Sequence, residues 1–232
     1  QVFDLEPSHS EQQPRIRRLI SPVDRHELFW ALATSPELLD LVEDLIGPDI
    51  KFHHGKLNFK FPRGGDEVKW HQDIQFWPHT NYDLLTIGIY LEDVEPGQGE
   101  MGFVPGSHNL PLFDLYDGDT WTGHIQPDDL SRLDLKDAVF PTGPAGTLTV
   151  HSCRMVHGSE PNQSDKPRPL LLQTYAAADA IPTTGLVDRT THGNEIVRGK
   201  PSKWARHDPR PCLLPPQKIG TIFQAQQREL EI

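Results

Sequence analysis

The chain has 232 residues, and its 36% hydrophobic content is enough for the core of one globular domain over residues 1–232. A formal net charge of −11 argues against nucleic acid and anionic membranes as partners. No apolar run approaches a membrane span or a signal peptide, and two cysteines are too few for a disulfide framework, so we expect a cytoplasmic protein.

The N-terminal part is predicted to be mainly helical, after an arm over residues 1–20 that we do not assign. Ser21-Pro22 and Ser35-Pro36 each offer an N-cap followed by proline at the first helical position. After the second of these, apolar residues recur at helical spacing as far as Ile46, and Gly47 ends the run.

From residue 50 onward the pattern changes to short extended runs between turn residues. No helix is predicted between these runs, which excludes a parallel βαβ fold and favours an antiparallel sandwich or jelly roll. Residues 109–144 are polar and rich in turn formers, and we interpret them as an inserted loop or lid. Beyond residue 179 apolar runs are few, so we expect the chain to wrap the outside of the fold. The predicted strands are residues 50–61, 84–91, 102–104, 146–151 and 169–176.

The stretch Trp70-His71-Gln72-Asp73 carries the strongest chemical signal. Successive side chains of an extended segment alternate between faces, so His71 and Asp73 point the same way. A second imidazole from a distant strand would complete two histidines and one carboxylate on one face of a metal, the arrangement of non-haem Fe(II) oxygenases. His151 and His157 compete for this third position, and the residues alone leave the choice open.

Two cations accompany these histidines in the sequence. Arg168 follows His157 and opens an apolar run, and Lys60 ends an apolar run upstream of His71. A guanidinium that enters an apolar strand needs a partner, which is either a protein carboxylate or a substrate carboxylate held in a bidentate fork. Lys60 either faces a cavity or extends toward water.

These pieces together resemble the phytanoyl-CoA dioxygenase family, which includes ectoine hydroxylases, within the Fe(II)/2-oxoglutarate oxygenases. The resemblance implies a mainly β fold with flanking helices: a double-stranded β-helix, or jelly roll, with N-terminal helices that buttress one sheet. Family members usually have a further strand and helix upstream, and this chain begins at Gln1, so we expect that an N-terminal segment is missing. The matching motifs are Leu57-Asn58-Phe59-Lys60, Trp70-His71-Gln72-Asp73, Gly99 to His108 with its Val-Pro-Gly-Ser-His marker, and His151 through Ser159 to Arg168.

The resemblance implies the metal ligands. It places His71, Asp73 and His157 on the iron as the catalytic centre, and so prefers His157 to His151, because the family's distal ligand stands directly before Gly-Ser. It also implies the kind of reaction. Related halogenases carry Gly or Ala at the position of Asp73, so a carboxylate there favours hydroxylation.

The resemblance further implies how the cosubstrate is held. Arg168 and Ser159 would bind the distal carboxylate of 2-oxoglutarate. Lys60 matches a lysine near the cosubstrate in ectoine hydroxylase-like members, and Thr86 is a further contact on the strand after the first ligands. One departure concerns the substrate, because His54 stands where ectoine hydroxylases have a glutamine.

Gln75, Phe76, Trp77 and His79 directly follow the metal motif and are candidates for the substrate side. An aromatic pair at this place is either core packing or a wall for an apolar or cationic group. The leading hypothesis is an enzyme that uses Fe(II), 2-oxoglutarate and O2 to hydroxylate a C–H bond of a small-molecule substrate, with release of succinate and CO2. The alternatives are a zinc-dependent hydrolase on the same triad, or a non-enzymatic metal-binding protein of the same fold.

Overall fold

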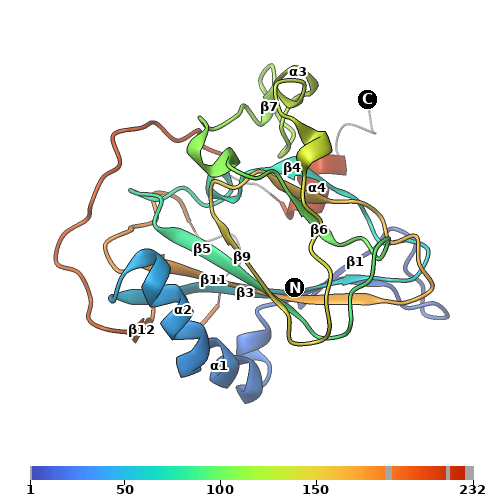
Figure 1. The fold of residues 1–232 in the computed structure, drawn as a ribbon, viewed down its shortest axis with the longest axis horizontal. Helices are drawn as coiled ribbons and strands as arrows, with labels where there is room; N and C mark the ends of the chain where they lie inside the picture. The colour runs from blue at the N-terminus through green and yellow to red at the C-terminus, as the bar shows by residue number, and fades with distance from the viewer. Residues whose placement is uncertain (1, 186–189, 218–219, 228–232) are drawn as a thin grey trace.

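A computed structural model describes residues 2–185, 190–217 and 220–227, and its frame is two antiparallel sheets that face one another (Figure 1). The larger sheet has the order β1 (Phe3–Leu5), β2 (Ile16–Ile20), β3 (Ile50–Lys60), β11 (Arg168–Ala177), β5 (Leu84–Tyr90) and β9 (Leu148–Ser152), with β12 (Ile196–Arg198) also on β3. The smaller sheet has the order β4 (Val68–His71), β10 (His157–Ser159) and β6 (Met101–Phe103). This architecture agrees with the predicted jelly roll.

All five predicted strands form, with ends displaced by at most two residues, as β3, β5, β6, β9 and β11. One expectation for the N-terminal part was wrong, because Ser21-Pro22 starts only the short turn η1 (Pro22–Asp24). The arm that we did not assign contains β1 and β2. Ser21 has a φ of 49° and its side chain caps no helix, so the next helix begins only after His26.

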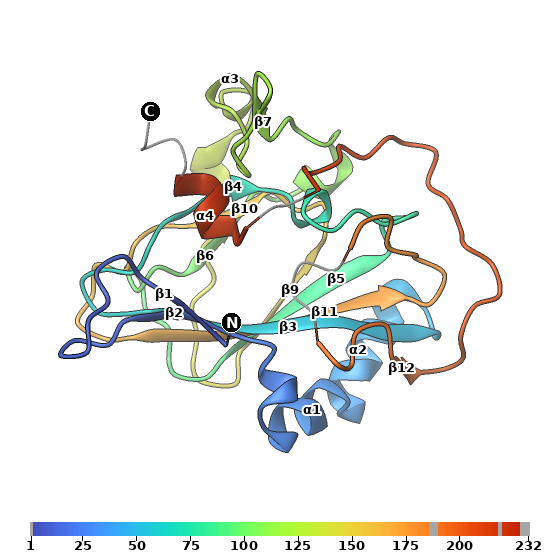
Figure 2. The same ribbon diagram turned by 180° about the vertical axis from the view of Figure 1, so that it is seen from behind.

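Two helices, α1 (Glu27–Ala33) and α2 (Pro36–Ile46), cover the outer face of the larger sheet (Figures 1 and 2). The start predicted for α2 is confirmed, because the Ser35 hydroxyl accepts a hydrogen bond from the Leu38 amide. Apolar side chains of both helices pack with Phe52, Leu171 and Ile87 of the sheet into one core. This core makes the larger sheet a rigid platform for the residues on its other face.

The inner face of the larger sheet is polar along β3, whereas β11 places Leu170 and Leu172 on this face beside Arg168. On β3 the alternation brings Lys60, Asn58, Lys56 and His54 to this side. Lys60 lies directly opposite Arg168 of β11. The face therefore presents a row of cationic and imidazole side chains toward the smaller sheet.

A β-bulge interrupts this alternation. Thr174 pairs with His54 and Tyr175 pairs with Phe52, so His53 is an extra residue on β3. A bulge of this kind bends the strand and re-aims a side chain. Two consecutive histidines are consequently buried on the inner side, where strict alternation would allow one.

Residues 109–144 contain the hairpin of β7 (Tyr116–Asp117) and β8 (Thr120–Trp121), the helix α3 (Pro127–Leu130) and the turn η4 (Leu135–Asp137). The segment is tied to the chain around the metal motif, because the Ile125 amide donates to the Trp70 carbonyl at 2.8 Å. Leu115 and Ile125 are fully buried. The idea that this segment works as a lid stays a prediction.

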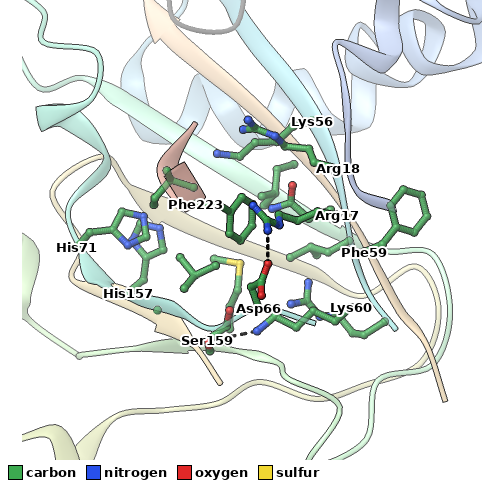
Figure 3. A pocket seen from close by; sticks show the side chains of 18 residues that line it. Arg17, Arg18, Lys56, Phe59, Lys60, Asp66, His71, His157, Ser159 and Phe223 are labelled. Atoms are coloured by element: carbon green, nitrogen blue, oxygen red, sulfur yellow. Dashed lines mark hydrogen bonds and ion pairs between the residues drawn. The ribbon is translucent and has the colours of Figure 1, made fainter. Parts of the chain in front are cut away.

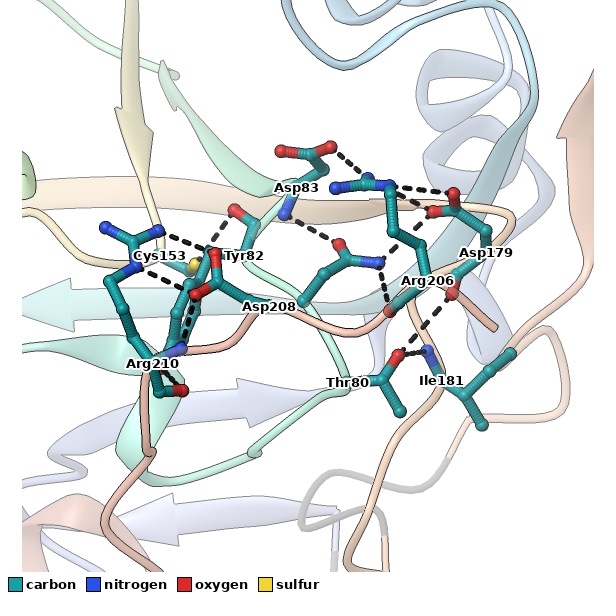
Figure 4. A network of polar contacts seen from close by, with 10 residues as sticks. Thr80, Tyr82, Asp83, Cys153, Asp179, Ile181, Arg206, Asp208 and Arg210 are labelled. Carbon is teal, nitrogen blue, oxygen red and sulfur yellow. Dashed lines mark hydrogen bonds and ion pairs between the residues drawn. The ribbon is translucent and has the colours of Figure 1, made fainter. Parts of the chain in front are cut away.

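The C-terminal part crosses the outside of the fold and is pinned by ion pairs (Figure 4). Arg206 binds Asp179 at 3.0 Å and also binds Asp83, and the Tyr82 hydroxyl donates to the Pro211 carbonyl at 3.1 Å. The chain then forms α4 (Ile222–Gln227), which packs on β4. Within the described ranges, no helix is long and apolar enough to cross a membrane.

Candidate metal centre

Three side chains from the smaller sheet and the turn beside it form a compact group. His71 ends β4, Asp73 begins the turn η2 (Asp73–Gln75), and His157 opens β10, where it pairs with His71 across the strands. One ligand atom from each lies within 4.8 Å of the other two. The Nε2 atoms of His71 and His157 lie 3.6 and 3.8 Å from Asp73 Oδ1, and all three side chains are buried.

Backbone carbonyls orient both imidazoles. Nδ1 of His71 donates to the Lys69 carbonyl at 2.8 Å, and Nδ1 of His157 donates to the Met155 carbonyl at 2.9 Å. This leaves the Nε2 lone pair of each ring for the space shared with Asp73, as in metal sites whose histidine tautomer is fixed by the other ring nitrogen.

The protonation states also suit a metal. Burial and the neighbouring His71 ring lower the pKa of His157 well below its usual value, so this ring is neutral. Burial opposes ionisation of Asp73, but the surrounding imidazoles of His157, His151 and His71 outweigh it and hold the pKa of Asp73 well below its usual range. A carboxylate with two imidazole nitrogens is the donor set of a divalent transition metal.

His151 lies close to this group but on another side of the carboxylate. Its Nε2 is 3.6 Å from Asp73 Oδ2, whereas His71 and His157 approach Oδ1. The compact group of possible ligands therefore contains His157 and not His151. His151 lies where it can hold the second oxygen of Asp73.

A cavity leads from His71 and His157 to the cationic end of the larger sheet (Figure 3). His71 and His157 lie at one end, and Lys60, Ser159 and Arg168 line the other. Arg168 donates from Nη2 to the Gly99 carbonyl at 2.7 Å, but its Nε and Nη1 have no acceptor among the described residues. A buried guanidinium with two idle donors is costly unless a ligand supplies the acceptors.

Lys60 adds a second positive charge at the same place. Its ammonium donates to the Ser159 carbonyl at 3.2 Å and to the carbonyl of Glu160. Burial, together with the charge of Arg168, lowers the pKa of Lys60 to about 7, and burial lowers the pKa of Arg168 to about 10. Like charges directly opposite on paired strands repel, so this end of the cavity favours an anion.

Thr86 lies outside this cavity. Its hydroxyl is buried and forms a hydrogen bond with the Thr174 hydroxyl at 2.9 Å. Thr86 and Thr174 lie in the row of paired residues that runs across four strands from His54 to His151. The role of Thr86 as a cosubstrate contact stays a prediction, and the structure places it one row away from the cavity wall.

A second cavity opens on the Asp73 side. Of the predicted substrate residues, Phe76 and Trp77 line it. Gln75 is turned away and donates to the Phe113 carbonyl at 2.6 Å, and His79 packs on Trp77 and borders a different pocket. The other lining residues are Arg18, His53, His54, Lys56, Asp73, Gly220, Thr221 and Ile222.

Several cavity residues were not among the predicted site residues. Lys56 and His54 share the alternation that brings Lys60 inward, so the period-two pattern of β3 could have indicated them. His53 reaches the cavity through the bulge, and Ile222 and Phe223 arrive from the far end of the chain. No local pattern in the sequence signals either.

Comparison with known proteins adds independent information. The family model for phytanoyl-CoA dioxygenase (PhyH) matches residues 7–170. A probable alpha-ketoglutarate-dependent hypophosphite dioxygenase of Stutzerimonas stutzeri is 35% identical over 93% of this chain and 76% of its own length. An L-proline trans-4-hydroxylase of Streptomyces griseoviridis is 30% identical over 71% of this chain and 69% of its own length. A crystal structure of EctD from S. alaskensis with bound Fe superposes with a TM-score of 0.68 at 25% identity, over 92% of this chain and 73% of that one.

Proposed function

Because the chain belongs to the phytanoyl-CoA dioxygenase family and is an Fe(II)- and 2-oxoglutarate-dependent dioxygenase, we propose that it hydroxylates a C–H bond of a small molecule. The reaction releases succinate and CO2. The observation that carries the proposal is one cavity with two histidines of the compact group of His71, Asp73 and His157 at one end and two buried cations at the other.

The residues present fit both groups that the reaction needs. His71, Asp73 and His157 would hold Fe(II), and Arg168, with Lys60 and Ser159, would hold the distal carboxylate of 2-oxoglutarate. Bound together, the metal and cosubstrate supply the oxidising power for hydroxylation. The Nε–H and Nη1–H groups of Arg168, which have no acceptor among the described residues, are charged donors that an incoming carboxylate would satisfy.

The protein's own residues orient the reactants and exclude water. The carbonyls that accept from His71 and His157 keep both Nε2 atoms directed toward the space beside Asp73, where they would hold the metal. A metal held there would border both cavities. Asp73 would supply a carboxylate ligand, which favours transfer of hydroxyl.

A zinc hydrolase is the weaker candidate for this site. A catalytic zinc would also accept the three ligands, but it would leave the buried Arg168 and Lys60 without an anion to bind. Small-molecule chemistry is supported by the names of the relatives, which refer to hypophosphite and L-proline.

The test is whether the purified protein forms succinate from 2-oxoglutarate and O2 in the presence of Fe(II). We expect slow formation without added substrate, and none when Fe(II) or 2-oxoglutarate is omitted or when Zn(II) replaces Fe(II). A protein that binds Fe(II) but neither binds 2-oxoglutarate nor forms succinate would contradict the proposal.

A further inference from the structure

The two cavities share a strongly cationic wall. Arg18, Lys56 and Ile222 line both of them, so the cosubstrate cavity and the cavity beside Asp73 are neighbours. Cationic side chains outnumber carboxylates along the combined lining. The cations are Arg17, Arg18, Lys56, Lys60 and Arg168, and the carboxylates are Asp66 and Asp73.

The two arginines of β2 are matched by protein acids. Arg17 lies 2.5 Å from Asp66 and 3.8 Å from Asp4, and Arg18 lies 3.7 Å from Asp4 (Figure 3 shows the Arg17–Asp66 pair). Arg168 and Lys60 are matched by the cosubstrate under the proposed function. These pairings account for every lining cation except Lys56.

Lys56 has no hydrogen bond or ion pair with any described residue, although its side chain is half-buried between the two cavities. When Fe(II) and 2-oxoglutarate are bound, the positive charges of the metal, Arg168 and Lys56 together exceed the negative charges of Asp73 and the cosubstrate. This holds even with Lys60 neutral. The site therefore keeps a positive potential that one small anion would offset.

The histidines on the bulge add polar groups to the same wall. The rings of His53 and His54 touch, and Nε2 of His53 is buried without a hydrogen-bond partner among the described residues. In the tautomer that carries its proton on Nε2, this imidazole is a donor for an oxyanion. Phe76 and Trp77 form the apolar part of the lining.

We propose that this second cavity is the substrate site and that its substrate is a compact oxyanion, bound by Lys56 with His53 and His54 beside Asp73. The inference rests on the proposed function and names its substrate class. The cavity is small, which suits a compact substrate, and its charge disfavours a cationic one.

The reaction balances for any such anion with a transferable hydrogen. The substrate X–H, 2-oxoglutarate and O2 give X–OH, succinate and CO2. One oxygen atom of O2 enters the product and the other enters succinate. Substrate and cosubstrate each supply two of the four electrons that reduce O2.

The test compares small probes that differ in charge. Hypophosphite, methylphosphonate and propionate serve as compact anions, propionamide is the neutral match of propionate, and L-proline and ectoine are zwitterions. We expect at least one anion to accelerate succinate formation above the rate without substrate, and propionamide to have no effect. Acceleration by a neutral or zwitterionic probe alone, or by none of the probes, would overturn the inference.

Variants of Lys56 test whether this residue binds the anion. Lys56→Met should raise the KM of the active anion about tenfold or more, the worth of a lost hydrogen bond to a charged group, and Lys56→Arg should restore most of it. Lys51→Met is the matched control, because Lys51 lies on the same strand but lines neither cavity. An equal KM in the Lys56→Met and Lys51→Met proteins would contradict the assignment.

The outcomes separate the two proposals. Succinate formation without added substrate and normal 2-oxoglutarate binding, with no response to anions, would remove only the anion inference. If the wild-type protein neither forms succinate nor binds 2-oxoglutarate, the proposed function is contradicted as well.

Discussion

Removal of the Arg168 guanidinium should weaken 2-oxoglutarate binding more than any other change at the far end of the cosubstrate cavity. The side chain is buried, and two of its donors lack acceptors until a carboxylate arrives. Truncating one partner of a buried, hydrogen-bonded charge pair costs about 2–5 kcal/mol. The expected rise in the dissociation constant is therefore about 30-fold or more.

The measurement is a calorimetric titration of 2-oxoglutarate into Mn(II)-loaded protein, in which no turnover occurs. Arg168→Gln should show the full loss, and Arg168→Lys should recover little of it, because an ammonium lacks the planar fork.

Arg154 provides a closely matched control. It is also buried, donates from Nη2 to a backbone carbonyl and has Nε and Nη1 without acceptors, but it lines neither of the two cavities beside the metal ligands. Arg154→Gln should leave 2-oxoglutarate affinity unchanged. The reasoning fails if a folded Arg168→Gln protein binds 2-oxoglutarate as the wild type does, or if Arg154→Gln loses as much affinity.

Three further predictions concern the metal, a proton and the inserted segment. His157→Ala should abolish Fe(II) binding measured by metal analysis, whereas His151→Ala should retain the iron; the reverse result would exchange their roles. Because the pKa of Lys60 is lowered to about 7, the free enzyme's ammonium loses its proton as pH rises through 7, and binding of the 2-oxoglutarate carboxylate should restore it. Calorimetry at pH 8 in buffers of different ionisation enthalpy should then show proton uptake, which Lys60→Met should abolish. Hydrogen exchange over residues 109–144 should slow when 2-oxoglutarate and substrate bind, and equal exchange in both states would exclude a lid.

The sequence was most informative where one physical rule dominates. The period-two pattern and turn residues located β3, β5 and β11, and the Ser-Pro cap with its glycine stop located α2. The strands that carry the metal ligands were harder, because β10 has only three residues and its pattern is too short for periodicity to be visible.

The residues of the candidate site also differ in how far the sequence could predict them. His71 and Asp73 could be paired from local geometry, but the choice of His157 over His151 depended on resemblance, because both stand in similar local sequence. His53 could not be placed, since a one-residue bulge changes which face a side chain occupies and leaves no mark in the residue pattern. The Ser21-Pro22 error has a related cause, because the same cap signal fits a single turn.

The position of α4 has a consequence for how substrate preference can change in this fold. The three proposed metal ligands and Arg168 lie within residues 7–170, the part that matches the family model. Thr221, Ile222 and Phe223 lie beyond it and still border the cavities. Gln226 holds the helix in place through the backbone of β4, with its Oε1 2.9 Å from the Lys69 amide. The proposed metal ligands and one wall of the neighbouring cavities are thus encoded far apart in the gene. Exchange of this short terminal segment between relatives would change the shape of the two cavities and leave the proposed metal ligands and Arg168 unchanged.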